Sequence, residues 1–196
     1  MKRKSVRSAP PFSVFRTTSK HGNPDTRFYL GKHPTGQLPP YVGLIELQNP
    51  EPPRELHSHP TFEIHFVVRG RMAFHTAKGL ELLSAGDVFI AAPGEPHGNG
   101  PFTHVRTSIF TLMLGITAQG GLTGLDPDHS PEIKKSLEKM SGFSFRAGTA
   151  VGESFHRIRR LSEGKTPFPE WVFQTAICDI LQRLLESKLP GKSAKL

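Results

Sequence analysis

The sequence contains one cysteine, Cys178, among its 196 residues. A single cysteine cannot form an intramolecular disulfide, and it cannot supply the several thiolates of a cysteine-based metal site. Long apolar runs are missing as well: no stretch approaches the roughly 18 residues of a membrane span, and the basic N-terminus lacks the unbroken apolar segment of a signal peptide. These absences predict a soluble, cytoplasmic protein with no membrane partner.

The motifs of nucleophilic and nucleotide chemistry are also missing. Cys178 lies within an apolar pattern of helical period, and the sequence has neither a serine-containing nucleophile elbow nor a glycine-rich phosphate loop. We therefore exclude the enzyme classes built on these motifs, and we assign no catalytic residue.

Proline and glycine, by contrast, are abundant. The chain has 18 Pro and 19 Gly, 37 of its 196 residues, or about 19% against the roughly 12% of average usage. Many tight turns follow, which argues against an all-helical bundle. The length allows one domain with a proper core and at most an appendage.

Positive charge is concentrated at the two ends of the chain. Residues 1–36 carry eight Lys/Arg and one Asp, residues 37–128 carry five Lys/Arg and nine Asp/Glu, and residues 129–196 carry twelve and seven. A basic stripe on one folded face would indicate nucleic-acid binding, but an excess in a polar head and on helix surfaces is typical of solvated segments.

The middle of the chain shows the pattern of short strands. Apolar stretches are separated by Pro and Gly, a spacing typical of a small barrel or sandwich; they read YVGLIEL, TFEIHFVV, RMAFHT, LELL, DVFI and VRTSIFTLML. After residue 128 the apolar spacing changes to a helical period. Ser130 as N-cap and Pro131 in the first turn predict a helix ending at Gly142, a second helix stops at Gly164, and a third begins near Pro169.

We therefore expect a mainly β fold in three segments. Residues 1–36 form a basic N-terminal arm that is partly disordered, with the first ten residues disordered and one or two short strands behind them. Residues 37–128 form the barrel. Residues 129–196 form a helical segment for dimerisation and packing, whose apolar last helix a single barrel cannot cover on every side.

A cluster of histidines indicates where the chemistry lies. Because side chains alternate along a strand, His57, His59, Glu63 and His65 share one face if the extended backbone is unbroken. The opposite face is apolar and needs cover from the N-terminal head, a C-terminal helix or a second subunit. Imidazoles and a carboxylate inside a barrel cost several kcal/mol unless they are hydrogen-bonded, hydrated or bound to a cation. A binding site is therefore predicted here.

Two stretches of the sequence resemble the signature motifs of the cupin superfamily: ELHSHPTFEIHFVVRG and LELLSAGDVFIAAPGEPHGNG. The resemblance implies a jelly-roll barrel, the double-stranded β-helix. It also implies four ligands for a divalent metal, namely His57, His59, Glu63 and His97. Imidazole and carboxylate ligands suit Fe, Mn, Ni or Zn.

The phrase GDVFIAAPGEPHG resembles more specifically the sensor domain of AraC-type transcriptional regulators, over about residues 40–189. This resemblance implies a homodimer that binds a small polar metabolite, such as a sugar, inside the barrel. The ligand-binding side chains would be His57, His59, Glu63, His65 and His97. Such regulators continue into a helix-turn-helix domain that contacts DNA; this chain stops before it, as a truncated regulator or a stand-alone sensor would.

Two functions therefore stay open at this stage, beside a metal-free structural or carbohydrate-storage cupin that no feature of the sequence supports. The first is a ligand-sensing domain, which signals through the arm or the helices. The alternative is a mononuclear metal enzyme, an oxygenase or isomerase, in which the metal keeps a position open for substrate. The sensor reading works with or without a metal, since the same side chains can hydrogen-bond an effector directly.

Overall fold

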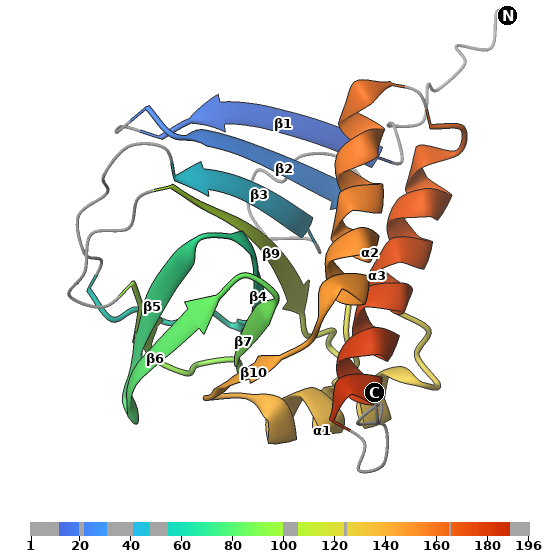
Figure 1. Cartoon of the computed structure of the whole chain (residues 1–196). Helices are drawn as coiled ribbons and strands as arrows, with labels where there is room; N and C mark the ends of the chain where they lie inside the picture. Colours follow the sequence, from blue (N-terminus) through green and yellow to red (C-terminus); the bar gives the residue numbers. More distant parts are fainter. Residues whose placement is uncertain are drawn as a thin grey trace, which may run out of the picture.

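The computed structural model describes residues 12–19, 22–30, 41–47, 55–99, 106–123, 125–164 and 166–188. Strands dominate the first two thirds of the chain, and helices follow them (Figure 1). The strands are β1 (Phe12–Thr18), β2 (Pro24–Leu30), β3 (Tyr41–Leu47), β4 (Thr61–Arg69), β5 (Arg71–Thr76), β6 (Gly79–Ser84), β7 (Asp87–Ala91), β8 (His97–Gly98), β9 (Thr107–Gly115) and β10 (Ser144–Arg146). The helices are α1 (Ser130–Met140), α2 (Thr149–Arg159), the short 3₁₀ helix η1 (Arg160–Glu163) and α3 (Pro169–Ser187).

The strands form two antiparallel sheets that close into a jelly-roll barrel. The larger sheet has the order β1-β2-β3-β9-β4-β7-β10, and the smaller one has the order β6-β5-β8. Helices α2 and α3 run side by side along one side of the larger sheet (Figure 1). The fold is therefore mainly β with three C-terminal α-helices, as the sequence predicts. Strands β1 and β2, which come from the 1–36 segment, belong to the larger sheet.

Two separate apolar cores result from the alternation along β4. Phe62, Ile64 and Phe66 point to the helices, where Phe66 stacks on Phe155 of α2 with ring centroids 5.7 Å apart. Val67, by contrast, belongs to a second core inside the barrel, together with residues of β5, β7 and β9. The apolar face of β4 is thus covered by the C-terminal helices. The face with the polar side chains is left to the barrel interior.

Helix α1 corrects one expectation from the sequence. Its N-cap is His129 and Ser130 is its first helical residue, so the helix begins one residue earlier than predicted. The Ser130 hydroxyl is buried and accepts a hydrogen bond from the backbone N–H of Leu122. The side chain therefore satisfies the preceding loop, so it is not available to cap the helix. Pro131 does lie in the first turn, and α3 begins at Pro169, as expected.

Two short strands are absent from the sequence prediction. Strand β10 pairs with β7 through three residues, and β8 pairs with β5 through two. Segments of two or three residues are too short to show a strand period, so the sequence pattern cannot reveal them. The expected disordered tip of ten residues lies outside the described part of the chain.

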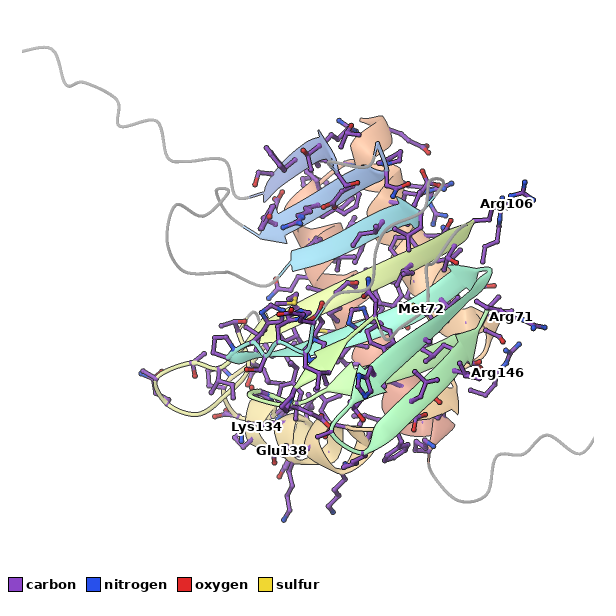
Figure 2. The ribbon with its side chains drawn as sticks, turned by 90° about the vertical axis from the view of Figure 1, so that its left-hand side faces the viewer. Arg71, Met72, Arg106, Lys134, Glu138 and Arg146 are labelled. Carbon is purple, nitrogen blue, oxygen red and sulfur yellow. The ribbon has the colours of Figure 1, made fainter. Side chains whose placement is uncertain are left out.

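The turn between β4 and β5 requires glycine at position 70. Gly70 has φ +85°, and a Cβ there would lie 2.6 Å from the Arg106 carbonyl oxygen and 3.0 Å from Thr107 Cα. Arg71 and Arg106 mark this end of the barrel in Figure 2. Gly70→Ala is expected to lower the free energy of unfolding by about 1–3 kcal/mol, measured by urea denaturation. Gly79→Ala is the control, because Gly79 has φ +132° but nothing within 4 Å of a Cβ; equal losses in the two variants would contradict a role for the close approach.

Candidate ligand and metal site

A cavity of about 420 Å³ opens into the barrel interior. Its walls come from the inward faces of the larger sheet, from β5 and from the segments that carry the histidines. The lining residues are Asp25, Arg27, Gly43, Ile45, Leu47, His57, His59, Glu63, His65, Met72, Phe74, His97, Gly98, Asn99, Ile109, Thr111 and Met113. The structure thus brings all five side chains predicted from the sequence, which are His57, His59, Glu63, His65 and His97, into one cavity.

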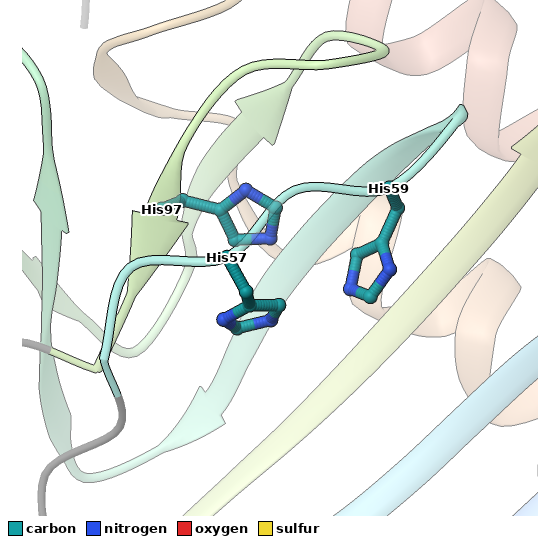
Figure 3. A group of neighbouring side chains, drawn as sticks. All are labelled: His57, His59 and His97. Atoms are coloured by element: carbon teal, nitrogen blue, oxygen red, sulfur yellow. The ribbon is translucent and has the colours of Figure 1, made fainter.

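His57 and His59 reach the cavity through a backbone arrangement that differs from the predicted strand. Strand β4 begins only at Thr61, so the extended backbone that would place His57 and His59 on one face is broken. His57 instead pairs with His97 through two backbone hydrogen bonds, each with an N to O distance of 2.9 Å. The segment before β4 is thereby tied to β8, and the rings of His57, His59 and His97 gather at one place (Figure 3).

The nitrogen and oxygen atoms of these side chains converge. His97 Nε2 lies 2.9 Å from Glu63 Oε2, and His59 Nε2 lies 3.4 Å from the same oxygen. His57, His59 and His97 each offer a ring nitrogen, and these three atoms lie within 4.8 Å of one another. Donor atoms bound to a single ion at about 2.1 Å are themselves about 3–4 Å apart. The spacing therefore fits one metal ion.

Backbone carbonyls set which ring nitrogen of two histidines faces the cavity. Nδ1 of His97 lies 2.8 Å from the Glu95 carbonyl oxygen, and Nδ1 of His57 lies 3.1 Å from the Glu55 carbonyl oxygen. Because a carbonyl only accepts, each Nδ1 carries the hydrogen and each Nε2 is left for a ligand. Orientation of this kind is what metal-bound histidines receive from their outer neighbours. The side chains form two overlapping groups that could hold a metal ion, one of His57, His59 and His97 and the other of Glu63, His65 and His97.

His65 lies on the same wall but in a more buried place. Its Nδ1 is 3.0 Å from the Thr111 hydroxyl, and its Nε2 is 3.3 Å from Glu63 Oε1 without the alignment of a hydrogen bond. Burial lowers the pKa of His65 to about 4 despite the nearby Glu63. The ring is therefore neutral near pH 7 and flanks the oxygen of Glu63 that faces away from His97.

The charge of Glu63 is stabilised by the ring of histidines. Burial would raise the pKa of its carboxyl, but His65, His97 and His59 outweigh burial and lower that pKa. For His97, burial is outweighed by the hydrogen bonds to Glu63 and to the Glu95 backbone, and its pKa is raised. For His59, burial is the largest influence and its pKa is lowered. When His97 is protonated, its Nε2 donates to Glu63 Oε2, and a metal cation bound at Nε2 would take the place of that proton.

Sequence reasoning missed the part of the cavity formed by β2. Asp25 and Arg27 both line it, and they form an ion pair with Arg27 Nη2 2.8 Å from Asp25 Oδ2. Their spacing of two residues in PDTRFYL is the only signal available, since it places both on one face of a strand. Nothing in the sequence says that this face points into the barrel.

The other histidines that the structure describes, and the basic residues of the helices, do not line the cavity. His75 is exposed on β5, and His104 lies outside the described residues. The basic residues of α2 and η1 that we named, Arg157, Arg159 and Arg160, are exposed, and on α1 Lys134 pairs with Glu138 at 2.7 Å (Figure 2). Within the described ranges, no helix is both long and apolar enough to cross a membrane.

Comparison with known families matches residues 39–194 to the AraC-like ligand binding domain. The chain belongs to this family. Among solved structures, this AraC-like domain is similar to the AraC-like transcriptional activator CuxR, with a TM-score of 0.52, 13% identity and coverage of 95% of this chain. It spans only 66% of the length of that activator. At 13% identity, the likeness shows the shared fold.

Weaker structural likenesses are found to two further solved proteins. One is to a Cupin 2 conserved barrel domain protein from Salinispora arenicola, with a TM-score of 0.36, 18% identity and coverage of 58% of this AraC-like domain and 86% of that chain. Another is to oxalate decarboxylase from Bacillus subtilis, a protein with Mn(II) centres, with a TM-score of 0.40, 15% identity and coverage of 70% and 42%. A search of curated protein sequences finds no match.

Proposed function

We propose that this AraC-like domain senses a small polar metabolite, such as a sugar, that binds in the barrel cavity. One observation carries the proposal: five polar side chains predicted from the sequence converge in a single cavity of about 420 Å³, within the range of small-molecule sites. Occupancy of the cavity would shift the arm or the helices between two packings, which requires that the effector bind one packing more tightly than the other.

We extend the proposal to the location, the oligomeric state and the segments of the protein. The protein would be a cytoplasmic homodimer, with residues 1–36 as an arm whose strands β1 and β2 join the larger sheet, 37–128 as the rest of the sensing barrel and 129–196 as its packing and dimerisation segment. Contact with DNA would come through a helix-turn-helix domain outside this chain. Transcriptional output would therefore belong to the whole regulator.

The ligand set for a metal is His57, His59, Glu63 and His97, and Fe, Mn, Ni and Zn are the candidate ions. When bound, such an ion supplies a Lewis acid for oxygen atoms of the effector. The chain's own residues orient the side chains that would bind the ion. The backbone carbonyls of Glu55 and Glu95 fix the imidazoles of His57 and His97, and the apolar side chains of the cavity exclude water.

The same ligand set supports the alternative, a metal-dependent cupin enzyme of the oxygenase or isomerase class. An ion held by these residues would act on a substrate in the cavity as a Lewis acid or oxygen activator, provided that it takes more than four ligands, as Fe, Mn and Ni can. Turnover separates the two functions. A sensor binds its ligand and releases it unchanged, whereas an enzyme converts it, so incubation of any bound compound with metal-loaded protein, followed by mass spectrometry, distinguishes them.

Ligand binding in the cavity can be tested by filling it. Gly43 lies on β3 and lines the cavity between Arg27 and Thr111, its partners in the sheet register. With a panel of sugars and small acids, we expect at least one compound to raise the wild-type melting temperature. Gly43→Leu should abolish that rise and still fold, because the new side chain occupies existing space.

The control for the filled cavity is His75→Leu, which places a leucine on the exposed face of β5. This variant should keep the full ligand-induced rise. A rise that survives in Gly43→Leu would show that the ligand binds elsewhere, and the absence of any rise in the wild type would count against the sensor function.

A further inference from the structure

One ring nitrogen of His65 is buried against Glu63 and shielded from the cavity. This nitrogen, Nε2, lies 3.3 Å from Glu63 Oε1 and has no hydrogen-bond partner among the described residues. The other ring nitrogen, Nδ1, lies 3.0 Å from the hydroxyl oxygen of Thr111. Burying a polar nitrogen without a partner costs free energy, which a neighbouring polar group can offset. The polar group beside Nε2 is the Glu63 carboxylate.

The two oxygens of Glu63 face different histidines. Oε2 lies 2.9 Å from His97 Nε2 and 3.4 Å from His59 Nε2, on the side of the proposed metal ligands. Oε1 lies on the other side, against His65. When the outer oxygen of a carboxylate accepts a hydrogen bond, the oxygen that it presents to a metal is fixed in place as well. His65 is therefore placed to orient Glu63 from behind.

The surroundings of His65 select one of its two tautomers. The neutral ring carries one hydrogen, on either Nδ1 or Nε2. With the hydrogen on Nδ1, the lone pair of Nε2 would face the negative Oε1 of Glu63 and be repelled. With the hydrogen on Nε2, the ring attracts the carboxylate, and Nδ1 accepts from the Thr111 hydroxyl. The second arrangement gives both ring nitrogens a partner.

We propose that His65 is a positioning residue that holds Glu63 in place as a metal ligand, by donating a hydrogen bond from Nε2 to Glu63 Oε1. Thr111 sets the tautomer by donating to Nδ1. The Nε2 and Oε1 atoms are within reach but not aligned, so the hydrogen bond forms when the carboxylate turns slightly. The inference rests on the metal ligand set of the proposed function. It gives His65 a role through Glu63, without direct contact with the ion or the effector.

The affinity of the full chain for Zn²⁺ tests this role. The protein is stripped of metal, and Zn²⁺ binding is measured by competition with a chromophoric chelator. His65→Phe removes both ring nitrogens and should bind Zn²⁺ about 10- to 100-fold more weakly, the usual effect of losing an outer neighbour of a metal ligand. His65→Gln should lose less than about tenfold, because its amide nitrogen can take the place of Nε2 and donate to Glu63.

The order of these two variants separates a positioning role from a structural one. The His65 ring packs on Phe74 with centroids 4.4 Å apart, a contact that phenylalanine keeps and glutamine loses. If the ring only filled space, His65→Gln would therefore be the more damaging substitution. His156→Phe is the matched control, because His156 packs on Phe110 and does not line the cavity. Its Zn²⁺ affinity should equal that of the wild type.

The tautomer of His65 can be tested without any metal. In metal-free protein with ¹⁵N-labelled histidine, the ring signals of wild-type His65 should show a protonated Nε2 and an unprotonated Nδ1. Thr111→Val removes the hydroxyl that donates to Nδ1, so signals of the other tautomer should appear. The same variant should bind Zn²⁺ about 2- to 10-fold more weakly, the range for one lost hydrogen bond between neutral groups.

Three results would overturn the inference. A hydrogen on Nδ1 in the wild type would remove the proposed donor and leave the metal site intact. Unchanged Zn²⁺ affinity in His65→Phe would show that Glu63 needs no support from His65, again with the metal site intact. Failure of the wild type to bind Zn²⁺ would reject the metal ligand set, and this inference would fall with it. The thermal-shift panel would still decide the sensing function.

Discussion

His57→Ala/His59→Ala is expected to abolish metal binding by this AraC-like domain. Protein without an affinity tag, purified without chelator, should carry close to one equivalent of a divalent transition metal, measured by elemental analysis. The double variant should carry about a tenth of that or less, because loss of even an outer neighbour of a metal ligand weakens binding about 10- to 100-fold, and here two ligands themselves are lost. Glu63 and His97 alone make an incomplete site.

The control for metal loss is His75→Ala/His156→Ala, which removes two histidines that do not line the cavity. This variant should keep the full equivalent. Circular dichroism of both double variants checks that the barrel is folded. A folded wild type without metal would contradict the metal site, and the same four side chains would then act by hydrogen-bonding the effector directly.

Phe155→Ala is expected to lower the free energy of unfolding by about 3–5 kcal/mol, the usual cost of deleting a buried aromatic ring. Phe155 of α2 is fully buried. Its ring stacks on Phe110 and on Phe66, with centroids 4.9 and 5.7 Å apart. The substitution therefore removes the contact by which the helices pack on β4 and β9. Urea denaturation followed by circular dichroism measures the loss.

Phe143→Ala provides the comparison for the stability change, since Phe143 is 38% exposed. Its loss should be about 1 kcal/mol or less, as for most surface substitutions. A cost for Phe155→Ala no greater than that for Phe143→Ala would show that the helices do not depend on this contact. The packing of the helices on the sheet, through which the proposed sensor would pass its signal, would then need another basis.

The sequence predicts the barrel and the five side chains of its polar wall because both depend on local patterns. The alternation along Thr61–Arg69 separates Phe66 from His65, and the structure places these two residues on opposite faces of β4. Proline marks the first turns of α1 and α3 for a local reason as well, since proline fits a helix only there. The prediction that the strands close into a barrel came from the resemblance to the cupin family.

Features that depend on distant contacts could not be predicted. The backbone pairing of His57 with His97 joins residues 40 positions apart, and it replaces the unbroken strand that parity alone suggested. The Ser130 hydroxyl likewise accepts a hydrogen bond from Leu122, a residue outside its own helix. Asp25 and Arg27 enter the cavity only because β2 joins the larger sheet beside β3. In each case the partner lies on another element, where sequence spacing carries no information.

A small molecule bound in the barrel cavity would contact the wall that carries His57, His59, His65 and His97. The imidazole resonances of ¹⁵N-labelled histidine test this binding most directly. The probe is the panel compound with the largest thermal shift, added to metal-free and to Zn²⁺-loaded protein. We expect the ring signals of His57, His59, His65 and His97 to shift on addition, while those of His75, His129 and His156 stay in place. Shifts confined to the second group would contradict the account.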